Sequence, residues 1–345
     1  AVIQFYVWRH PRWIAAQTLR GCFLMPENKY QEYVFSLSKE QFRELSAAVD
    51  MRFDKEIYGV TTYEEAAEMY HREPQCPKCG SDSQHEDGYT SAGRKRYRCK
   101  ECGSSYTLLS DSIFNSAKIP FHKLMGYINL MSFNVPLEMC CEILNISSNT
   151  ADLWRRKIFT TVNNYQNHLR LYERIWIDET YIDDYSILHN PFEKRKRGLS
   201  KDKICIVVAI DIYKNMVAVI CGHGKPSSRR IYKALRDHVI PGSTIVHDGD
   251  NSYNYLIKKL NCDSAVYKAD SKDPEYLKNM ALINNMCGWL KRYIGHFIGM
   301  NISNLQTYLN WFIYLHRCKR DDEKWPKMAR ILRHLVLMRT KFTRK

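Results

Sequence analysis

The chain has 345 residues and a formal net charge of +15, with 45% hydrophobic and 26% charged residues. This length allows two or three domains with cores of their own, and the composition is that of a soluble globular protein. No apolar run reaches the roughly 18 residues of a membrane span, which argues against an integral membrane protein. The positive charge indicates a polyanionic partner, most often nucleic acid, although a basic protein without such a partner has the same composition.

The N-terminal part of the sequence has two sections. The chain opens on AVIQFYVWRHPRW, a short apolar run without a clear cleavage site, so we expect no signal peptide. Residues 1–24 are expected to be a weakly structured extension or upstream sequence read through. A helical region should follow at 25–70, where SKEQFRELSAAV and TTYEEAAEMYHR each place a capping residue before an amphipathic run.

Four of the twelve cysteines form two CxxC pairs. Cys76 and Cys79 are separated from Cys99 and Cys102 by 19 residues. Two tight turns, each presenting two thiolates, predict a tetrahedral zinc site and a zinc ribbon at 71–110, whereas a redox dithiol needs only one pair. The other cysteines are scattered through apolar patterns, which favours a reducing cytosol. Between the pairs, YTSAGRKRYRC predicts a basic hairpin that either contacts phosphates or is solvated.

Residues 111–168 predict helices with a helix-turn-helix-like end. PFHKLMGYINLMSFNV forms one helix, and PLEMCCEILNI is separated by a break at 145–147 from SNTADLWRRKIFTTV, with Ser148 as the N-cap. The last helix carries Arg155, Arg156 and Lys157, which we predict to bind DNA. Other small helical bundles give the same pattern.

From about residue 169 to 318 the pattern changes to an α/β core. Strands at IWIDETYI, ICIVVAIDIY and MVAVICG are followed by helix, strand, helix, strand and helix. This order matches a ribonuclease-H-like mixed sheet with flanking helices. Asp178 lies inside the first strand, and strict alternation turns Glu179 to the opposite face. Asp248 ends the buried strand STIVHD.

Two aspartates on neighbouring central strands predict a metal site. Phosphodiester chemistry uses two Mg²⁺ ions about 4 Å apart, and Mg²⁺ prefers carboxylate and other hard oxygen ligands. A third ligand from a helix would complete the site, and Asn284 follows Asp248 after 35 residues, 249 to 283. Lys291 lies two helical turns beyond Asn284, on the same face. Alone, Asp248 reads equally as a turn residue before Gly249, and an isolated asparagine resembles any helix-surface residue.

Other acidic residues compete less well for the third position. Three of them lie in a predicted polar loop, a poor place for a rigid site: Asp270, Asp273 and Glu275. Four are interpreted as surface or turn residues: Asp183, Asp184, Asp211 and Asp250. Asn285 sits about 100° from Asn284 around the helix and is a weaker candidate.

The motifs WIDETYI, HDGDNSY, INNMCGWLK and GMNISNLQTYLNWF resemble DDE-type transposases of bacterial insertion sequences. With a zinc ribbon ahead, they resemble the insertion sequence 1595 (ISXO2-like) family over about residues 70–318. The resemblance implies a metal-dependent DNA transposase that cleaves the 3′ strand at transposon ends and joins the 3′-OH to target DNA. It implies Mg²⁺ or Mn²⁺ on Asp178, Asp248 and Asn284, since asparagine is among this family's variants, and Lys291 as a ligand of a terminal phosphate.

The same resemblance implies terminal repeats and target DNA as partners, a homodimer or larger synaptic complex, and a cytoplasmic, nucleoid-associated bacterial protein. Two basic segments fit DNA binding. One is a loop between the first two strands with Lys194, Arg195, Lys196 and Arg197. The other is the tail at 319–345, which either follows phosphates, is solvated, or packs through ARILRHLVLM. The alternatives are a catalytically decayed or domesticated DNA-binding protein and a zinc-ribbon transcription factor.

Overall fold

The computed structural model divides the chain into two compact units. Unit 1 comprises Ala1–Arg155 and Met328–Lys345, and unit 2 comprises Arg156–Lys327. The structure describes residues 29–187, 200–270, 272–297, 299–319, 326–340 and 342. In this part of the chain, no helix combines the length and apolar character needed to cross a membrane.

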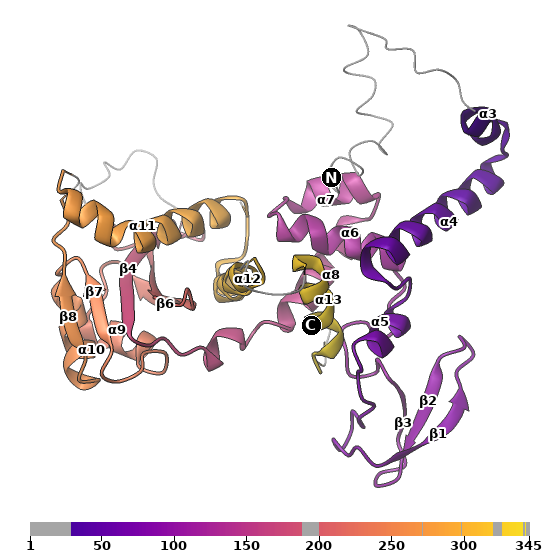
Figure 1. Cartoon of the computed structure of the whole chain (residues 1–345), viewed down its shortest axis with the longest axis horizontal. Helices are drawn as coiled ribbons and strands as arrows, with labels where there is room; N and C mark the ends of the chain where they lie inside the picture. The colour runs from indigo at the N-terminus through magenta and orange to yellow at the C-terminus, as the bar shows by residue number, and fades with distance from the viewer. Residues whose placement is uncertain are drawn as a thin grey trace, which may run out of the picture. The chain divides into compact units, whose positions relative to one another are not determined.

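The described part of unit 1 begins with three helices, two of which have caps that follow from the sequence (Figure 1). They are α3 (Lys29–Ser36), α4 (Lys39–Tyr58) and α5 (Tyr63–Met69). The Ser38 hydroxyl accepts a hydrogen bond from the Gln41 backbone N–H, and the Gln41 side chain accepts one from the Ser38 N–H. The Thr62 side chain caps α5 in the same position. Both predicted helix starts are therefore confirmed.

The cysteine-rich segment is a small antiparallel sheet. Its strands are β1 (Gln84–Tyr89), β2 (Lys95–Cys99) and β3 (Ser105–Thr107). Basic side chains of the hairpin pair with acidic groups inside unit 1: Arg94 lies 2.7 Å from Glu64, and Arg98 lies 3.2 Å from Asp87. These ion pairs neutralise part of the hairpin's positive charge.

Three further helices form the predicted helical segment. They are α6 (Phe121–Ser132), α7 (Leu137–Leu144) and α8 (Ser148–Thr160). Asn145 makes the turn with a left-handed backbone, φ 48°. The predicted cap is wrong by one residue: Ser147, not Ser148, accepts the Thr150 backbone N–H at 3.2 Å. The Tyr127 hydroxyl donates to the Ala151 carbonyl at 2.7 Å and ties α6 to α8.

The C-terminal segment is not only a basic tail. Helix α13 (Lys327–Leu337) buries Ile331, Leu332, Leu335 and Val336. Within unit 1 the Arg72 guanidinium donates to the Val336 carbonyl and, at 2.5 Å, to Asp111. Arg339 donates to the same carboxylate at 2.6 Å. Of the three alternatives for this segment, contact with phosphates, solvation or packing, the third applies to α13, whose apolar side chains are buried.

Unit 2 is built on one five-stranded mixed sheet in the order β6-β5-β4-β7-β8. The strands are β4 (Arg174–Ile182), β5 (Ile204–Asp211), β6 (Met216–His223), β7 (Thr244–His247) and β8 (Asp263–Val266). The pairings β4–β5 and β5–β6 are antiparallel, while β4–β7 and β7–β8 are parallel. This is the ribonuclease-H-like arrangement that the element order predicts.

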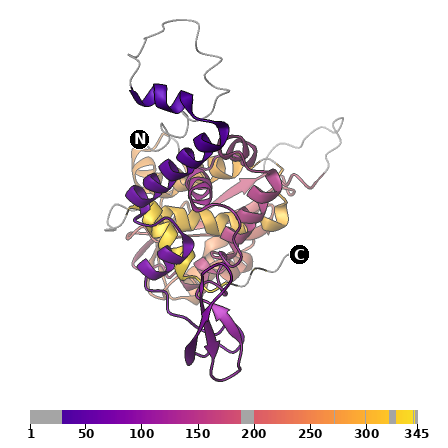
Figure 2. The same ribbon diagram turned by 90° about the vertical axis from the view of Figure 1, so that its right-hand side faces the viewer.

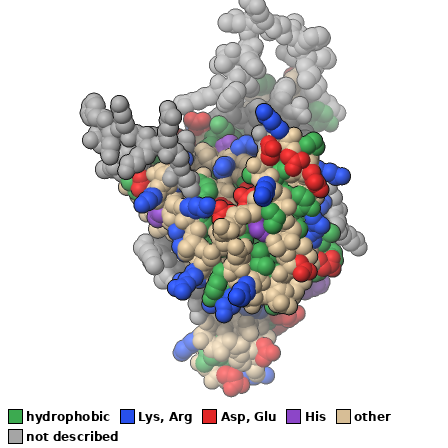
Figure 3. Space-filling model, turned by 90° about the vertical axis from the view of Figure 1, so that its left-hand side faces the viewer, with side chains coloured by type: hydrophobic (Ala, Val, Ile, Leu, Met, Phe, Trp, Pro, Cys, Tyr) green, Lys and Arg blue, Asp and Glu red, His purple; other side chains and the backbone are tan. Residues whose placement is uncertain are grey.

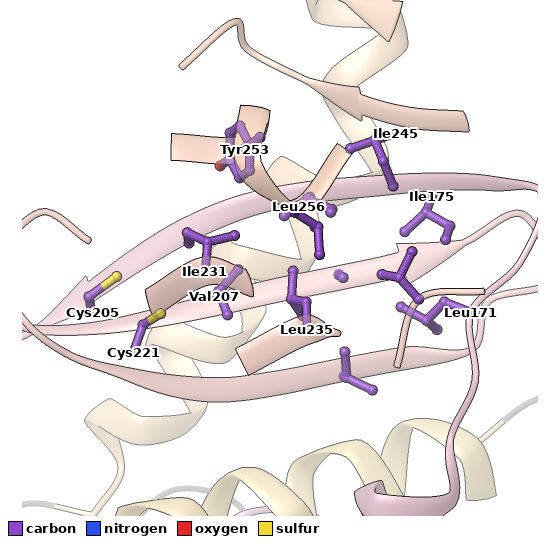
Figure 4. Close-up of a cluster of buried hydrophobic side chains, with 14 residues drawn as sticks. Leu171, Ile175, Cys205, Val207, Cys221, Ile231, Leu235, Ile245, Tyr253 and Leu256 are labelled. Atoms are coloured by element: carbon purple, nitrogen blue, oxygen red, sulfur yellow. The ribbon is translucent and has the colours of Figure 1, made fainter. Parts of the chain in front are cut away.

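The two faces of this sheet carry different helices. One face packs on α9 (Ser228–Leu235), the short turn η2 (Asn251–Tyr253) and α10 (Asn254–Lys259), through the cluster in Figure 4. The other face packs on α11 (Pro274–Gly295) and α12 (Leu305–Cys318). The start of α11 differs from the prediction that Asp273 and Glu275 lie in a loop. Asp273 is the N-cap of this helix, and Glu275 lies in its first turn.

The boundary between the units falls inside α8, earlier than the predicted 168/169 boundary. The reason is packing: Phe159 stacks edge-on against Tyr308 at 4.8 Å. Beyond α8, the turn η1 (Tyr165–His168) is held by Gln166, whose side chain donates to the Asn310 side chain at 2.7 Å. The end of α8 therefore belongs to the α12 side of unit 2.

A buried carboxyl in α4 makes the stability of unit 1 depend on pH. Burial, with a smaller contribution from Asp50, raises the pKa of Asp54 from 3.8 to about 7. The pKa of Asp54 is therefore higher in the folded state than in the unfolded state. Below pH 4 this carboxyl is protonated in both states and does not reduce the stability of unit 1, whereas stability is lost as the pH rises from about 4 to about 7. Asp54→Asn should therefore match wild type in thermal unfolding near pH 4.5. At pH 8 it should be more stable, on the order of 2 kcal/mol. Equal differences at both pH values would contradict a raised pKa.

Candidate active site

Asp178 lies in the middle of β4, on the face that packs against α11. The Glu179 backbone N–H donates to Asp178 Oδ1 at 2.8 Å. Burial and the nearby charge of Asp248 raise the pKa of Asp178 to about 6, against hydrogen bonds and the Lys291 charge, which lower it. The ionised carboxylate is thus poorly solvated where it stands, a condition that a cation relieves.

Asp248 follows the last residue of β7, and the register of β7 with β4 brings it near Asp178. Trp176 pairs with Val246 in the parallel β4–β7 ladder. Two residues further along, the strands bring Asp178 and Asp248 close enough for their charges to interact. The Asp250 backbone N–H donates to Asp248 Oδ1 at 2.9 Å. Both aspartates that the sequence singled out are therefore brought together.

The turn after β7 is held from its inner side by His247. The Gly249 backbone N–H donates to His247 Nδ1 at 3.1 Å, so Nε2 carries the ring proton and faces the Ser264 hydroxyl at 2.9 Å. Burial lowers the pKa of His247, which favours this neutral form. Gly249 has φ +94°, and a Cβ there would meet Val266 Cγ1 at 3.0 Å. The turn thus requires glycine, and its rigidity positions Asp248.

Helix α11 brings further polar groups to Asp178. The Cys287 thiol favours the ionised form of Asp178, and burial raises the pKa of that thiol. The Trp176 indole N–H donates to the Asn279 carbonyl at 2.8 Å and fixes the helix against β4. Lys291 is one turn after Cys287, and its charge acts on Asp178.

Asn284 lies on the same side of α11, one turn before Cys287, and is half-buried. Among the described residues it has no hydrogen bond to either aspartate. The structure therefore places Asn284 on the same side of α11 as Cys287 and Lys291, without a hydrogen bond to either aspartate. Cys287 itself was missed by the sequence analysis, although its spacing of three from Asn284 is the helical signal that locates it.

Glu179 also belongs to this region, from the other face of the sheet. The Ser252 hydroxyl donates to Glu179 Oε1 at 3.3 Å. Burial, and then the charges of Asp178, Asp248 and Asp250, raise the pKa of Glu179 to about 7. The sequence correctly turned Glu179 away from Asp178, but it did not show that this carboxyl ties β4 to the turn after Asp248.

The other acidic residues have structural roles. Asp273 accepts the Glu275 backbone N–H at 2.9 Å as the cap of α11. Asp211 accepts the Asn215 backbone N–H at 2.8 Å in the β5–β6 turn. Asp184 is buried, not on the surface, because its carboxylate lies 2.9 Å from His223 Nε2 and accepts hydrogen bonds from Ser186. These contacts account for Asp273, Asp211 and Asp184 without a role in binding a cation.

A separate group of thiols lies in unit 1. Within the described ranges, it is the one group of three or more histidine, cysteine or acidic side chains whose ligand atoms all lie within 4.8 Å of one another: Cys76, Cys79, Cys99 and Cys102. Cys76 Sγ lies 3.5 Å from Cys102 Sγ, and Cys79 Sγ lies 3.6 Å from Cys99 Sγ. Four ligands at the Zn–S distance of about 2.3 Å would be about 3.8 Å apart, so the thiols fit zinc.

The two halves of this thiol site repeat one backbone turn. The Gly80 N–H donates to the Cys76 carbonyl at 2.9 Å, and the Gly103 N–H donates to the Cys99 carbonyl at 3.1 Å. Both glycines have positive φ, 77° and 69°. The CxxCG spacing therefore folds twice into the same turn, with its sulfur atoms directed to one point.

The predicted DNA-contacting residues are placed unequally. Arg155 is buried, and its charge faces Tyr127, so α8 does not present it outward as the sequence predicted. Arg156 is exposed and Lys157 is half-buried on the same helix. The loop with Lys194, Arg195, Lys196 and Arg197 lies outside the described residues.

Comparisons with known proteins identify the region around the aspartates. Residues 170–315 match the ISXO2-like transposase domain. No curated protein sequence matches the chain.

Three solved structures are distantly similar. A simian T-cell lymphotropic virus intasome in complex with PP2A regulatory subunit B56 gamma is 11% identical, with a TM-score of 0.29, covering 54% of this chain and 67% of that one. The Mos1 mariner paired-end complex with Mn is 13% identical, with a TM-score of 0.25 and coverages of 61% and 74%. The Mos1 transposase paired-end complex with left transposon end is 14% identical, with a TM-score of 0.23 and coverages of 64% and 77%.

Removing one thiol should abolish zinc binding. Cys99→Ser is expected to reduce the zinc content from one ion per chain to nearly none and to expose the segment 84–107 to proteolysis, because this small sheet depends on the metal for its folding. Zinc analysis and limited proteolysis measure both effects. Cys262→Ser, a half-buried cysteine elsewhere, is the control. Full zinc content in Cys99→Ser would rule out the four-thiol site.

Loosening the turn that carries Asp248 should weaken metal binding without unfolding unit 2. Ser252→Ala removes the hydroxyl that donates to Glu179. We expect Mn²⁺ affinity, followed by electron paramagnetic resonance, to fall about tenfold. Ser303→Ala, in the exposed turn η3 (Ile302–Asn304), serves as the control. Unchanged Mn²⁺ affinity in Ser252→Ala would show that this hydrogen bond does not position Asp248.

Proposed function

We propose that this chain, whose residues 170–315 match the ISXO2-like transposase domain, cuts DNA at transposon ends and joins them to target DNA. The observation that carries the proposal is the meeting of Asp178 and Asp248 across the parallel β4–β7 pair of a ribonuclease-H-like sheet. Two partly buried carboxylates that interact are costly unless a cation binds them. Their environment therefore supports a divalent metal rather than a purely structural role.

The reaction that we propose has two steps of one kind. Water first attacks the phosphodiester at the transposon end, so that the broken P–O bond leaves a free 3′-OH. That hydroxyl then attacks a phosphodiester of target DNA, forming one P–O bond as another breaks. Bound Mg²⁺ or Mn²⁺ would stabilise charge on the attacking and leaving oxygens.

The residues of this chain have separate parts in the proposed site. Asp178 and Asp248 hold the metal ions, and Asn284 supplies a neutral amide oxygen from α11. Lys291, whose charge acts on Asp178, binds a phosphate of the DNA end. The Cys287 thiol favours the ionised form of the Asp178 carboxylate. With asparagine as third ligand, the two aspartates supply the negative charge of the site.

DNA binding is proposed for the turn of α7 and α8 and for the loop 194–197. Arg156 and Lys157 are the contact residues on α8, and Arg155 is left out because it is buried. In unit 2, Lys and Arg side chains are spread over the face drawn in Figure 3, with acidic side chains between them. The zinc-binding thiols would stabilise the β1–β3 sheet and have no part in catalysis.

A strand-transfer assay tests the proposed function. Protein, DNA flanking its gene, supercoiled plasmid and Mg²⁺ should give joined products. Asp178→Asn and Asp248→Asn should each reduce joining by roughly 100-fold or more, because each removes a metal-binding charge. Asn284→Ala should also reduce joining, because alanine offers no oxygen ligand. Asn284→Glu should retain joining, because glutamate offers a carboxylate oxygen in place of the amide oxygen. Asp263→Asn, on the exposed edge of β8, is the matched control.

The assay also separates the rival function. Binding of the flanking DNA by wild type without joined products would support a decayed or domesticated DNA-binding protein. Loss of joining in the aspartate variants but not in Asn284→Ala would keep the transposase and remove Asn284 from the metal site.

A further inference from the structure

The exposed hydrophobic side chains of the described chain are concentrated at the start of unit 1. Of 22 exposed large hydrophobic residues, eight fall in α3 and α4: Tyr30, Tyr33, Phe35, Phe42, Val49, Met51, Phe53 and Ile57. The two helices and the two residues between them span positions 29–58, so more than a third of the exposed large apolar side chains come from about a tenth of the described residues. Scattered apolar residues on a surface are normal, but such a concentration marks an interaction site.

Most of the apolar residues of α4 form a single stripe. Phe42, Leu45, Val49, Phe53 and Ile57 follow one another at spacings of three or four residues. At 100° per residue they fall within about 60° of one line along the helix. Phe42 is 49% exposed, Val49 is 36% exposed and Ile57 is 50% exposed. A helix of 20 residues is about 30 Å long, so the stripe offers an extended surface.

The contacts of α4 with α6 are made from another side of the helix. The attached side carries Asp54, the buried residue of this helix, and Tyr58, whose ring lies edge-on at 6.0 Å from Phe121 of α6. Nearby, Asp50 lies 3.7 Å from His122 of α6. Both Asp54 and Tyr58 are more than 100° around the helix from the middle of the stripe. Figures 1 and 2 show the N-terminal end of α4 leading toward α3, away from α6.

The charges beside the stripe identify the kind of partner. The whole chain has a net charge of +15, yet α4 carries four basic and five acidic residues. A surface with this balance has no attraction for a polyanion, so DNA is not its partner. The two signs alternate along the helix, as in KEQFRE and DMRFDKE. A second α4 laid against the first therefore places opposite charges beside one another, without a block of like charge.

We propose that α4 is a self-association surface, on which the Phe42–Ile57 stripe packs against the same stripe of a second copy of this chain. The contact is isologous, since the same residues are buried on both partners. The apolar stripe supplies the driving force, and the alternating charges at its margins select another α4. This inference rests on the surface of α4 and does not depend on the catalytic proposal.

The test measures the oligomeric state of the full-length chain without DNA. Nuclease-treated, zinc-loaded protein at moderately high salt is examined by analytical ultracentrifugation over a range of concentrations. Wild type should sediment as a dimer. The double variant Phe42→Glu/Val49→Glu should raise the dimer dissociation constant by roughly 100-fold or more. Met51→Glu adds charge at a residue that is 52% exposed on the opposite side of α4, and it should remain dimeric.

The outcomes distinguish this surface from other arrangements. A monomeric wild type would overturn the proposal and leave the stripe to another protein or to the segment before α3. A double variant that dimerises like wild type would place the interface elsewhere and also overturn it. Circular dichroism of both variants shows whether the helices are retained. Since no step requires catalysis, failure of the strand-transfer assay would leave this result unaffected.

Discussion

The parallel pairing of β4 with β7 is the constraint on which the proposed site depends. It sets Asp178 against Asp248 inside a sheet whose two faces are covered by helices. Burial, and to a smaller extent the charge of Asp248, raise the pKa of Asp178 to about 6. Two ionised carboxylates in this place therefore oppose folding. Backbone N–H groups and the Cys287 thiol offset part of that unfavourable energy. A divalent cation would offset more, so the metal fits the fold as well as the chemistry.

The chain separates two kinds of metal ligand. Four cysteine thiols, which are soft ligands, lie close together in unit 1, where two similar turns ending in glycine direct the sulfur atoms toward one point. Hard carboxylates gather in unit 2, at the end of β7 and the middle of β4. Zinc prefers the first kind of ligand and magnesium the second, so in the proposed sites each metal would bind in a different unit. Each unit thus has a ligand set of its own.

Sequence predicted most of what depends on local chemistry. Ser38 and Thr62 cap helices because their side chains reach backbone N–H groups three residues on, and the CxxCG repeats fold by their own turns. The order of strands followed from hydrophobic alternation. The pair Asp178 and Asp248 was found because both residues end or interrupt buried strands.

What sequence could not predict depends on tertiary packing. Arg155 is buried because α8 turns it toward Tyr127, and residue type alone does not indicate that face. Asp184 is buried by His223, 39 positions away. Glu179 was correctly directed away from Asp178, yet its link to Ser252 connects elements 73 positions apart. The same limit applied to α13, whose apolar face is buried in unit 1.

The most direct measurement of the central claim is the position of bound Mn²⁺ in a crystal of the full-length protein, found by its anomalous scattering. The account predicts an ion between the Asp178 and Asp248 carboxylates, with the Asn284 amide oxygen close enough to bind it or a second ion. An ion held by Glu179 and Asp250 instead, or no ion at saturating Mn²⁺, would contradict the account.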